Sequence, residues 1–166
     1  MKRLLFFPIL ILSFSGNAQN VNIPDANFKA YLVANTQINT NSDTEIQITE
    51  ANAYAGQIYC SSQSITDLTG IEEFTSLTTL DVAINQLTSL DLSNNVALTT
   101  LSCGTNPLGS LDVSSNVLLT RLYCNDNQLT SLDLSKYWQS PDTQTSHNCS
   151  GVLIKFVELL NARIEF

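Results

Sequence analysis

One phrase recurs three times at a fixed offset in the middle of this chain and constrains its fold more than any other feature. The copies read LTTLDVAINQLTSLDLSNNVA from Leu77, LTTLSCGTNPLGSLDVSSNVL from Leu98 and LTRLYCNDNQLTSLDLS from Leu119. A divergent copy, IYCSSQSITDLTGIEEFTSL, begins at Ile58. One such block cannot bury its apolar side alone, so the blocks should stack as coils whose leucines form one continuous core.

Two columns of the repeat predict its local structure. The segments 80–82, 101–103 and 122–124 alternate between apolar and polar residues, which predicts short strands that pair in parallel between neighbouring coils. An asparagine follows each segment at the turn, at Asn85, Asn106 and Asn127. We expect these side-chain amides to be buried and to bind the free backbone groups of the turn.

The phrase LxxLxVxxNxL, as in LTTLDVAINQL, resembles the leucine-rich-repeat signature. Its nested second half, LTSLDLSNN, resembles the 21-residue bacterial repeats of secreted Bacteroidetes-type proteins, and ITDLTGIEEFTSLTTL from Ile65 is similar to the 22-residue internalin repeat. The resemblance implies an α/β repeat solenoid: a short leucine-rich-repeat arc with a parallel β-sheet on its concave face and a helical N-terminal cap. The family binds proteins, peptides and glycans with one architecture, so the ligand stays open.

Residues 1–18 have the pattern of a secretory signal peptide. Lys2 and Arg3 precede an apolar run over 4–12, and the small residues Gly16 and Ala18 predict cleavage before Gln19. The run is shorter than the ~20 residues of a membrane-spanning helix. We therefore expect a secreted, extracellular or cell-surface protein with no membrane span in its mature chain. An N-terminal cap over 19–56 and repeats over 57–135 should follow.

The tail, residues 136–166, carries no repeat letters and leaves two hypotheses open. SGVLIKFVELLNARIEF can form a C-terminal capping helix, with apolar residues at Val152, Leu153, Phe156, Val157 and Leu160. Alternatively, the tail is a frameshifted or truncated part of the repeat region. The nucleotide sequence of the locus distinguishes the two hypotheses.

The predicted cap contains a helix over 22–35, with Pro24 and Asp25 at its start and Phe28, Leu32 and Val33 buried. The loop 39–50 resembles an EF-hand calcium loop of the internalin-like cap. Its ligand positions hold Asn39, Asn41, Asp43, Glu45, Gln47 and Glu50. Asn at the first position and Thr44 at the usual glycine position depart from that pattern. A weak calcium site is one interpretation; a cap that kept the fold without the ion is the one we favour, with no other cofactor.

The four cysteines also have two interpretations. In an exported protein an even number of cysteines is compatible with disulfides. Cys60, Cys103 and Cys124 share the buried strand column with Val82, which favours small buried hydrophobic side chains instead. Cys103 and Cys124 lie one coil apart, a spacing that would permit a bridge.

Charge and chemistry exclude two classes of function. The net charge is -8, and Arg121 is the only basic residue between Lys29 and Lys136, so the basic footprint of a nucleic-acid-binding protein is missing. His147 is the only histidine, and Asp91, Asp112 and Asp133 form one line rather than two carboxylates opposed across a cleft. We therefore predict a protein that is not an enzyme.

The outward side chains of the predicted strands form the candidate ligand-binding face. They include Tyr59, Thr79, Asp81, Thr100, Ser102, Arg121, Tyr123 and Asn125. Tyr and Arg are frequent binding hot spots, so we expect Tyr123 as a packing surface and Arg121 as a donor for a protein, peptide or glycan. The alternative is a structural or adhesive spacer within a longer surface protein, with no dedicated ligand site.

Overall fold

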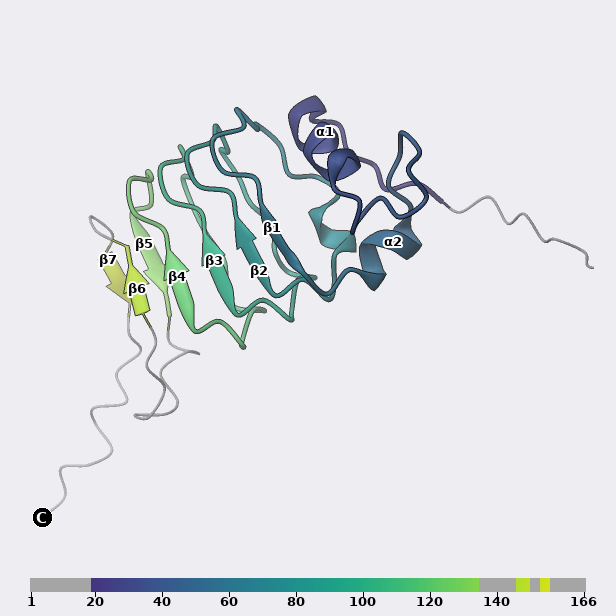
Figure 1. Cartoon of the computed structure of the whole chain (residues 1–166). Coiled ribbons are helices and arrows are strands. Elements are labelled where there is room, and N and C mark those ends of the chain that lie inside the picture. Colours follow the sequence, from purple (N-terminus) through teal and green to yellow (C-terminus); the bar gives the residue numbers. More distant parts are fainter. Residues whose placement is uncertain (1–18, 135–145, 150–152, 156–166) are drawn as a thin grey trace, which may run out of the picture.

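A parallel sheet with one strand per coil organises the computed structural model, which describes residues 19–134, 146–149 and 153–155. Five strands lie in the order β1-β2-β3-β4-β6, side by side in Figure 1. They are β1 (Gln57–Tyr59), β2 (Thr79–Asp81), β3 (Thr100–Ser102), β4 (Arg121–Tyr123) and β6 (Ser146–Asn148). The predicted parallel pairing of neighbouring coils is confirmed.

The register of the sheet follows the repeat letters. Leu80 of β2 pairs with Leu101 of β3, which pairs with Leu122 of β4. All three leucines are at most 1% exposed, and the other leucine columns of the repeat are buried with them, except at Leu90, which is partly buried. Because each coil covers the apolar side of the next, the core is a continuous column along the axis of the solenoid.

Each strand leads into a turn that passes through the left-handed backbone region. Ile84, Thr105 and Asp126 occupy equivalent places in three coils, with φ between 54° and 56°. The asparagine that follows each of them binds this turn, as predicted. Asn106 Nδ2 donates to the carbonyls of Val82 and Cys103, both at 3.0 Å.

A second asparagine column, absent from our sequence predictions, lies at the other turn of the coil. Asn95 and Asn116 are fully buried. Asn95 Nδ2 donates to Ile71 O at 2.8 Å and Phe74 O at 3.1 Å, so it joins its coil to the preceding one, where the 3-10 helix η1 (Ile71–Glu73) lies. The recurrent Ser-x-Asn of 93–95 and 114–116 was the available signal for this column.

Two short helices precede the first coil (Figure 1). Helix α1 (Ala26–Ala34) begins at Asp25, whose carboxylate accepts hydrogen bonds from the backbone of Asn27 and Phe28, and it buries Phe28 and Leu32. Val33, which we expected to be buried, is half-buried. Helix α2 (Ile48–Ala53) begins with a reciprocal capping box between Gln47 and Glu50.

The tail contains two strands where it is described. β6 continues the parallel sheet after β4, and β7 (Leu153–Lys155) pairs in parallel with β5 (Ser131–Asp133). The predicted helix is therefore wrong at 153–155, because a partner strand in the preceding coil is available there. The rest of that predicted helix and the predicted signal peptide lie outside the described residues. The frameshift remains a hypothesis, which the nucleotide sequence of the locus would test.

The sheet register also corrects our interpretation of the cysteines. Since Tyr123 pairs with Asn148, Cys149 occupies the cysteine column one coil beyond Cys124. The two form a disulfide with 4.7 Å between their Cα atoms. Cys60 and Cys103 are free and buried, so the prediction of small buried thiols is confirmed for these two alone.

No helix in the described part of the chain is long and apolar enough to cross a membrane.

Candidate functional site

The outward side of β1 to β4, here called the strand face, carries two columns of side chains that cross the strands. The sheet register aligns Gln57, Thr79, Thr100 and Arg121 in one column. It aligns Tyr59, Asp81, Ser102 and Tyr123 in the other column. Neighbouring strands are ~4.8 Å apart, so each column is a row of closely spaced side chains.

A shallow hollow of about 360 Å³ lies on the strand face. It is lined by Gln57, Tyr59, Thr79, Leu80, Asp81, Thr100, Ser102, Arg121 and Tyr123. The structure thus brings together seven of the eight residues that we predicted for this face. Asn125 lies beyond β4, where its Nδ2 donates to Asp126 at 2.7 Å, and it does not line the hollow. Gln57 was missed, although it aligns with Thr79 one repeat earlier.

Tyr59 forms the wall of the hollow nearest to α1. Its side chain is 55% exposed, and its hydroxyl donates to Gln57 Oε1 on the same strand. Its backbone N–H donates to the hydroxyl of Tyr31 in α1 at 2.9 Å. The side chain of Tyr59 therefore stands on a strand whose backbone is held by both the sheet and α1.

The Arg121 side chain contacts the neighbouring strand β3. Its Nε donates to Thr100 Oγ1 on β3 at 3.2 Å, and the side chain is exposed. Asp81 lies two strands away, and its Oδ1 accepts the backbone N–H of Ala83 at 3.1 Å. The two opposite charges form no ion pair with each other or with another described residue.

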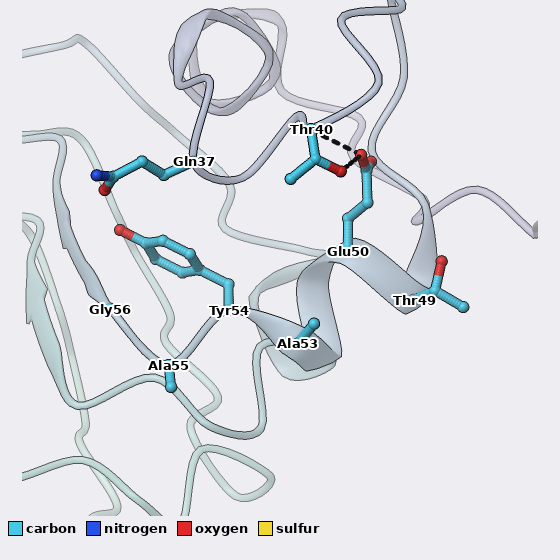
Figure 2. A pocket seen from close by; sticks show the side chains of 8 residues that line it. All are labelled: Gln37, Thr40, Thr49, Glu50, Ala53, Tyr54, Ala55 and Gly56. Carbon is cyan, nitrogen blue, oxygen red and sulfur yellow. Dashed lines mark hydrogen bonds between the residues drawn. The ribbon is translucent and has the colours of Figure 1, made fainter.

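A larger hollow of about 550 Å³ lies between Gln37, α2 and the segment that follows it (Figure 2). In Figure 2 the Glu50 carboxylate turns toward Thr40, whose backbone and hydroxyl donate to it at 2.8 Å each. The Tyr54 hydroxyl donates to Gln57 O at 2.9 Å. Because the chain itself engages these polar groups, we assign no site to this hollow.

The candidate calcium loop folds into one cluster, but donors of the chain surround its oxygens. Lys29 Nζ contacts both Glu45 oxygens at 2.6 and 2.8 Å. Asp43 accepts the Glu45 N–H at 2.7 Å and the Gln47 amide at 2.9 Å. Glu50 accepts from Thr40, Asn41 and the Gln47 N–H. The contacts of Glu50 with Thr40 and Asn41 join the end of the loop to its start.

The first and second ligand positions are also engaged. Asn39 is buried and points its Nδ2 at Val33 O and Asp43 O, at 3.0 and 2.8 Å. Asn41 Nδ2 donates to the side chains of Asp43 and Gln47. Both amide groups thus bind acceptors of the chain itself. Among the described residues, no three His, Cys, Asp or Glu side chains gather as a metal site.

We predict that Glu50→Ala lowers the free energy of unfolding by roughly 1–2 kcal/mol, because four hydrogen bonds to its carboxylate are lost. The loss should be the same with calcium or with a chelator, as measured by urea denaturation. Thr49→Ala, the exposed neighbour, is the control. Calcium-dependent stability of the unsubstituted chain that is abolished in Glu50→Ala would contradict this prediction.

The same contacts predict a pH dependence. Burial alone would raise the pKa of Glu50, but the hydrogen bonds from Gln47, Thr40 and Asn41 outweigh it and hold the pKa below its ordinary 4.5. A lowered pKa in the folded state contributes stability above pH 4.5, and this contribution is lost as the pH falls through the lowered value. Glu50→Ala should therefore flatten the acid side of the stability profile.

The two free thiols of the described residues, Cys60 and Cys103, are buried. Burial raises the pKa of the Cys103 thiol to about 12. Burial and the nearby Asp81 do the same for Cys60. The side chains of Asp91 and Asp112 accept the N–H of the serine two residues later, at 2.9 and 2.8 Å, which is a turn function.

Parallel in-register strands, leucine columns and an asparagine column define a leucine-rich-repeat solenoid. No family model matches the chain. Internalin J of Listeria monocytogenes serotype 4b is 38% identical to it over 84 residues, which cover 49% of this chain and 9% of that protein. The chain therefore spans less than a tenth of the length of this curated relative.

Two solved internalins share the fold. The functional domain of internalin J, described as including a cysteine ladder, superposes with a TM-score of 0.55 and 33% identity. The match covers 85% of this chain and 39% of that domain. The internalin InlF of Listeria monocytogenes superposes with a TM-score of 0.56 and 25% identity, covering 82% of this chain and 46% of the other.

Proposed function

We propose that this chain is a secreted or cell-surface recognition module that binds a protein, peptide or glycan through the strand face, on the concave side of the arc. The observation that carries the proposal is the hollow lined by Tyr59, Arg121 and Tyr123. Rigid tyrosines surrounded by short hydroxyl side chains give contact area at low entropic cost, as they do in antibody paratopes. The similarity to internalins supports a protein-interaction role in particular.

The domain layout belongs to the same proposal. Residues 1–18 would be removed on export, and 19–56 would cap the first coil. The buried contacts of Phe28 and Leu32, and the hydrogen bond between Tyr31 and Tyr59, support this capping role. Cys60, Cys103, Cys124 and Cys149 would form a ladder like the one described for internalin J, interrupted at Val82.

Two substitutions test the strand face. Against a ligand found by screening extracellular proteins and glycans, Tyr123→Ala and Arg121→Ala should each cost more than ~1 kcal/mol of binding free energy. Asp112→Ala, on an exposed turn away from the strand face, should leave the affinity unchanged. Calorimetric titration measures all three. A larger loss for Asp112→Ala than for the two face variants, or no loss in any of them, would place the site elsewhere, whereas a screen that finds no ligand would favour a spacer.

A further inference from the structure

We propose that the hollow of the strand face recognises a dipolar protein segment, with a cationic side chain at Asp81 and a carboxylate at Arg121. The inference rests on the proposed function and adds the chemistry of the ligand. Its basis is a pair of opposite charges that share one hollow without neutralising each other.

Arg121 keeps most of its hydrogen-bond donors free within the described residues. Its guanidinium has five N–H donors, of which only the one on Nε has a partner in the described residues, Thr100. This chain has 15 acidic and 7 basic residues, so carboxylates are abundant and basic groups are scarce. The other members of its column, Gln57, Thr79 and Thr100, are neutral. An arginine bound through one nitrogen still presents its other guanidinium N–H groups. These can bind a ligand carboxylate with two parallel hydrogen bonds.

Asp81 supplies the opposite charge in the same hollow. Its Oδ1 is used by the Ala83 N–H, and its Oδ2 makes no hydrogen bond within the described chain. Its neighbours in the column are Tyr59 and Ser102, which carry no charge. A half-buried carboxylate with one free oxygen in a hollow is suited to accept a lysine or arginine of a partner.

The spacing of the two charges favours a protein segment over an acidic glycan. Asp81 and Arg121 are two strands apart and offset by two residues, which places their Cα atoms roughly 12 Å apart. In an extended peptide, side chains at i and i+4 lie on the same face about 13 Å apart. Such a segment reaches both Asp81 and Arg121. Its middle side chain then lies over the hydroxyls of Thr100 and Ser102 and over Tyr123. A polyanionic glycan would satisfy Arg121 and be repelled by Asp81.

Peptide probes test this with the chain from which residues 1–18 have been removed. The probe is acetyl-Lys-Ser-Tyr-Ser-Glu-amide, and its neutral match has Gln in place of Lys and Glu. Amide signals of Tyr59, Ser102 and Tyr123 in NMR titrations report binding at the strand face. We expect the dipolar probe to bind about tenfold more tightly than the neutral one at low ionic strength. Arg121→Gln and Asp81→Asn should each remove most of this difference, and Asp112→Asn none of it.

Three outcomes would overturn the inference. If both probes bind the strand face equally, the face binds ligands but the dipolar recognition is wrong. If trigalacturonate binds more tightly than the dipolar probe and depends on Arg121 alone, the ligand is an acidic glycan. If the shifted signals lie away from the strand face, the proposed function fails together with the inference. Asp81→Asn keeps an oxygen for the Ala83 N–H, so its turn stays intact and the comparison stays valid.

Discussion

Asn106→Ala should lower the free energy of unfolding by roughly 2–4 kcal/mol. The Asn106 amide donates to Val82 O and Cys103 O, and its Oδ1 accepts the Leu87 N–H at 3.0 Å. The side chain is 4% exposed, so water cannot take over these contacts. Alanine therefore leaves the buried Leu87 N–H without a partner and removes one of the two amide donors from each of these carbonyls, at the junction between two coils. Urea denaturation followed by circular dichroism measures the change.

Asn94→Ala is the matched control for this prediction, because it removes the same side chain from an exposed place on a turn. Its effect should stay within about 0.5 kcal/mol. Asn95→Ala, one residue later and fully buried, should resemble Asn106→Ala instead. Equal effects for Asn94 and Asn106 would show that the buried asparagine column does not stabilise the junctions.

Reduction of the Cys124–Cys149 disulfide should cost about 3 kcal/mol, because the bridge restricts the unfolded chain. The two cysteines are separated by 25 positions in the sequence, and the loss of chain entropy on closing such a loop predicts an effect of this size. The bridge also joins β6 to β4, and in the sequence the residue three positions after Cys149 is Val152. The other junctions have Asn85, Asn106 and Asn127 at that place.

The measurement compares unfolding with and without dithiothreitol, in the unsubstituted chain and in Cys149→Ala. The reductant should destabilise the unsubstituted chain and leave Cys149→Ala unchanged. Cys103→Ala keeps the bridge and should remain sensitive to the reductant. A reductant effect below about 1 kcal/mol in the unsubstituted chain would mean that β6 is held by other contacts.

The periodic part of the chain allowed its fold to be predicted, because in a parallel stack one repeat length determines both the register and the burial. The pairing of Leu80, Leu101 and Leu122, and the bonds of Asn106, follow from the letters alone. The tail does not follow the repeat period, so its structure could not be predicted in this way. The sequence separation between Leu122 and its partner in β6 is longer than one repeat, and that partner is His147 instead of a leucine. The sequence pattern of the repeat therefore did not predict this strand.

The site was predictable as a surface but not as a set of contacts. Alternation placed Tyr59, Arg121 and Tyr123 on the outward side of the strands, and the hollow gathers them. The hydrogen bonds from Arg121 to Thr100 and from Tyr59 to Tyr31 depend on side-chain rotamers and on where α1 packs. Neither is encoded in the repeat period. The hydrogen-bonded loop at Glu50 likewise required the positions of Lys29 and Gln47, which the EF-hand resemblance does not supply.

The strand face as a binding surface is the central claim, and site-specific photocrosslinking tests it most directly. A benzophenone side chain would replace Ser102 at the centre of the hollow or, in a second protein, Asp91 on an exposed turn outside it. Each protein would be irradiated with extracellular material from the source organism. We expect a discrete adduct from position 102. Excess unlabelled protein should compete this adduct away, and excess protein with both Arg121→Ala and Tyr123→Ala should not. Adducts formed only from position 91, or competed equally by both proteins, would contradict the central claim.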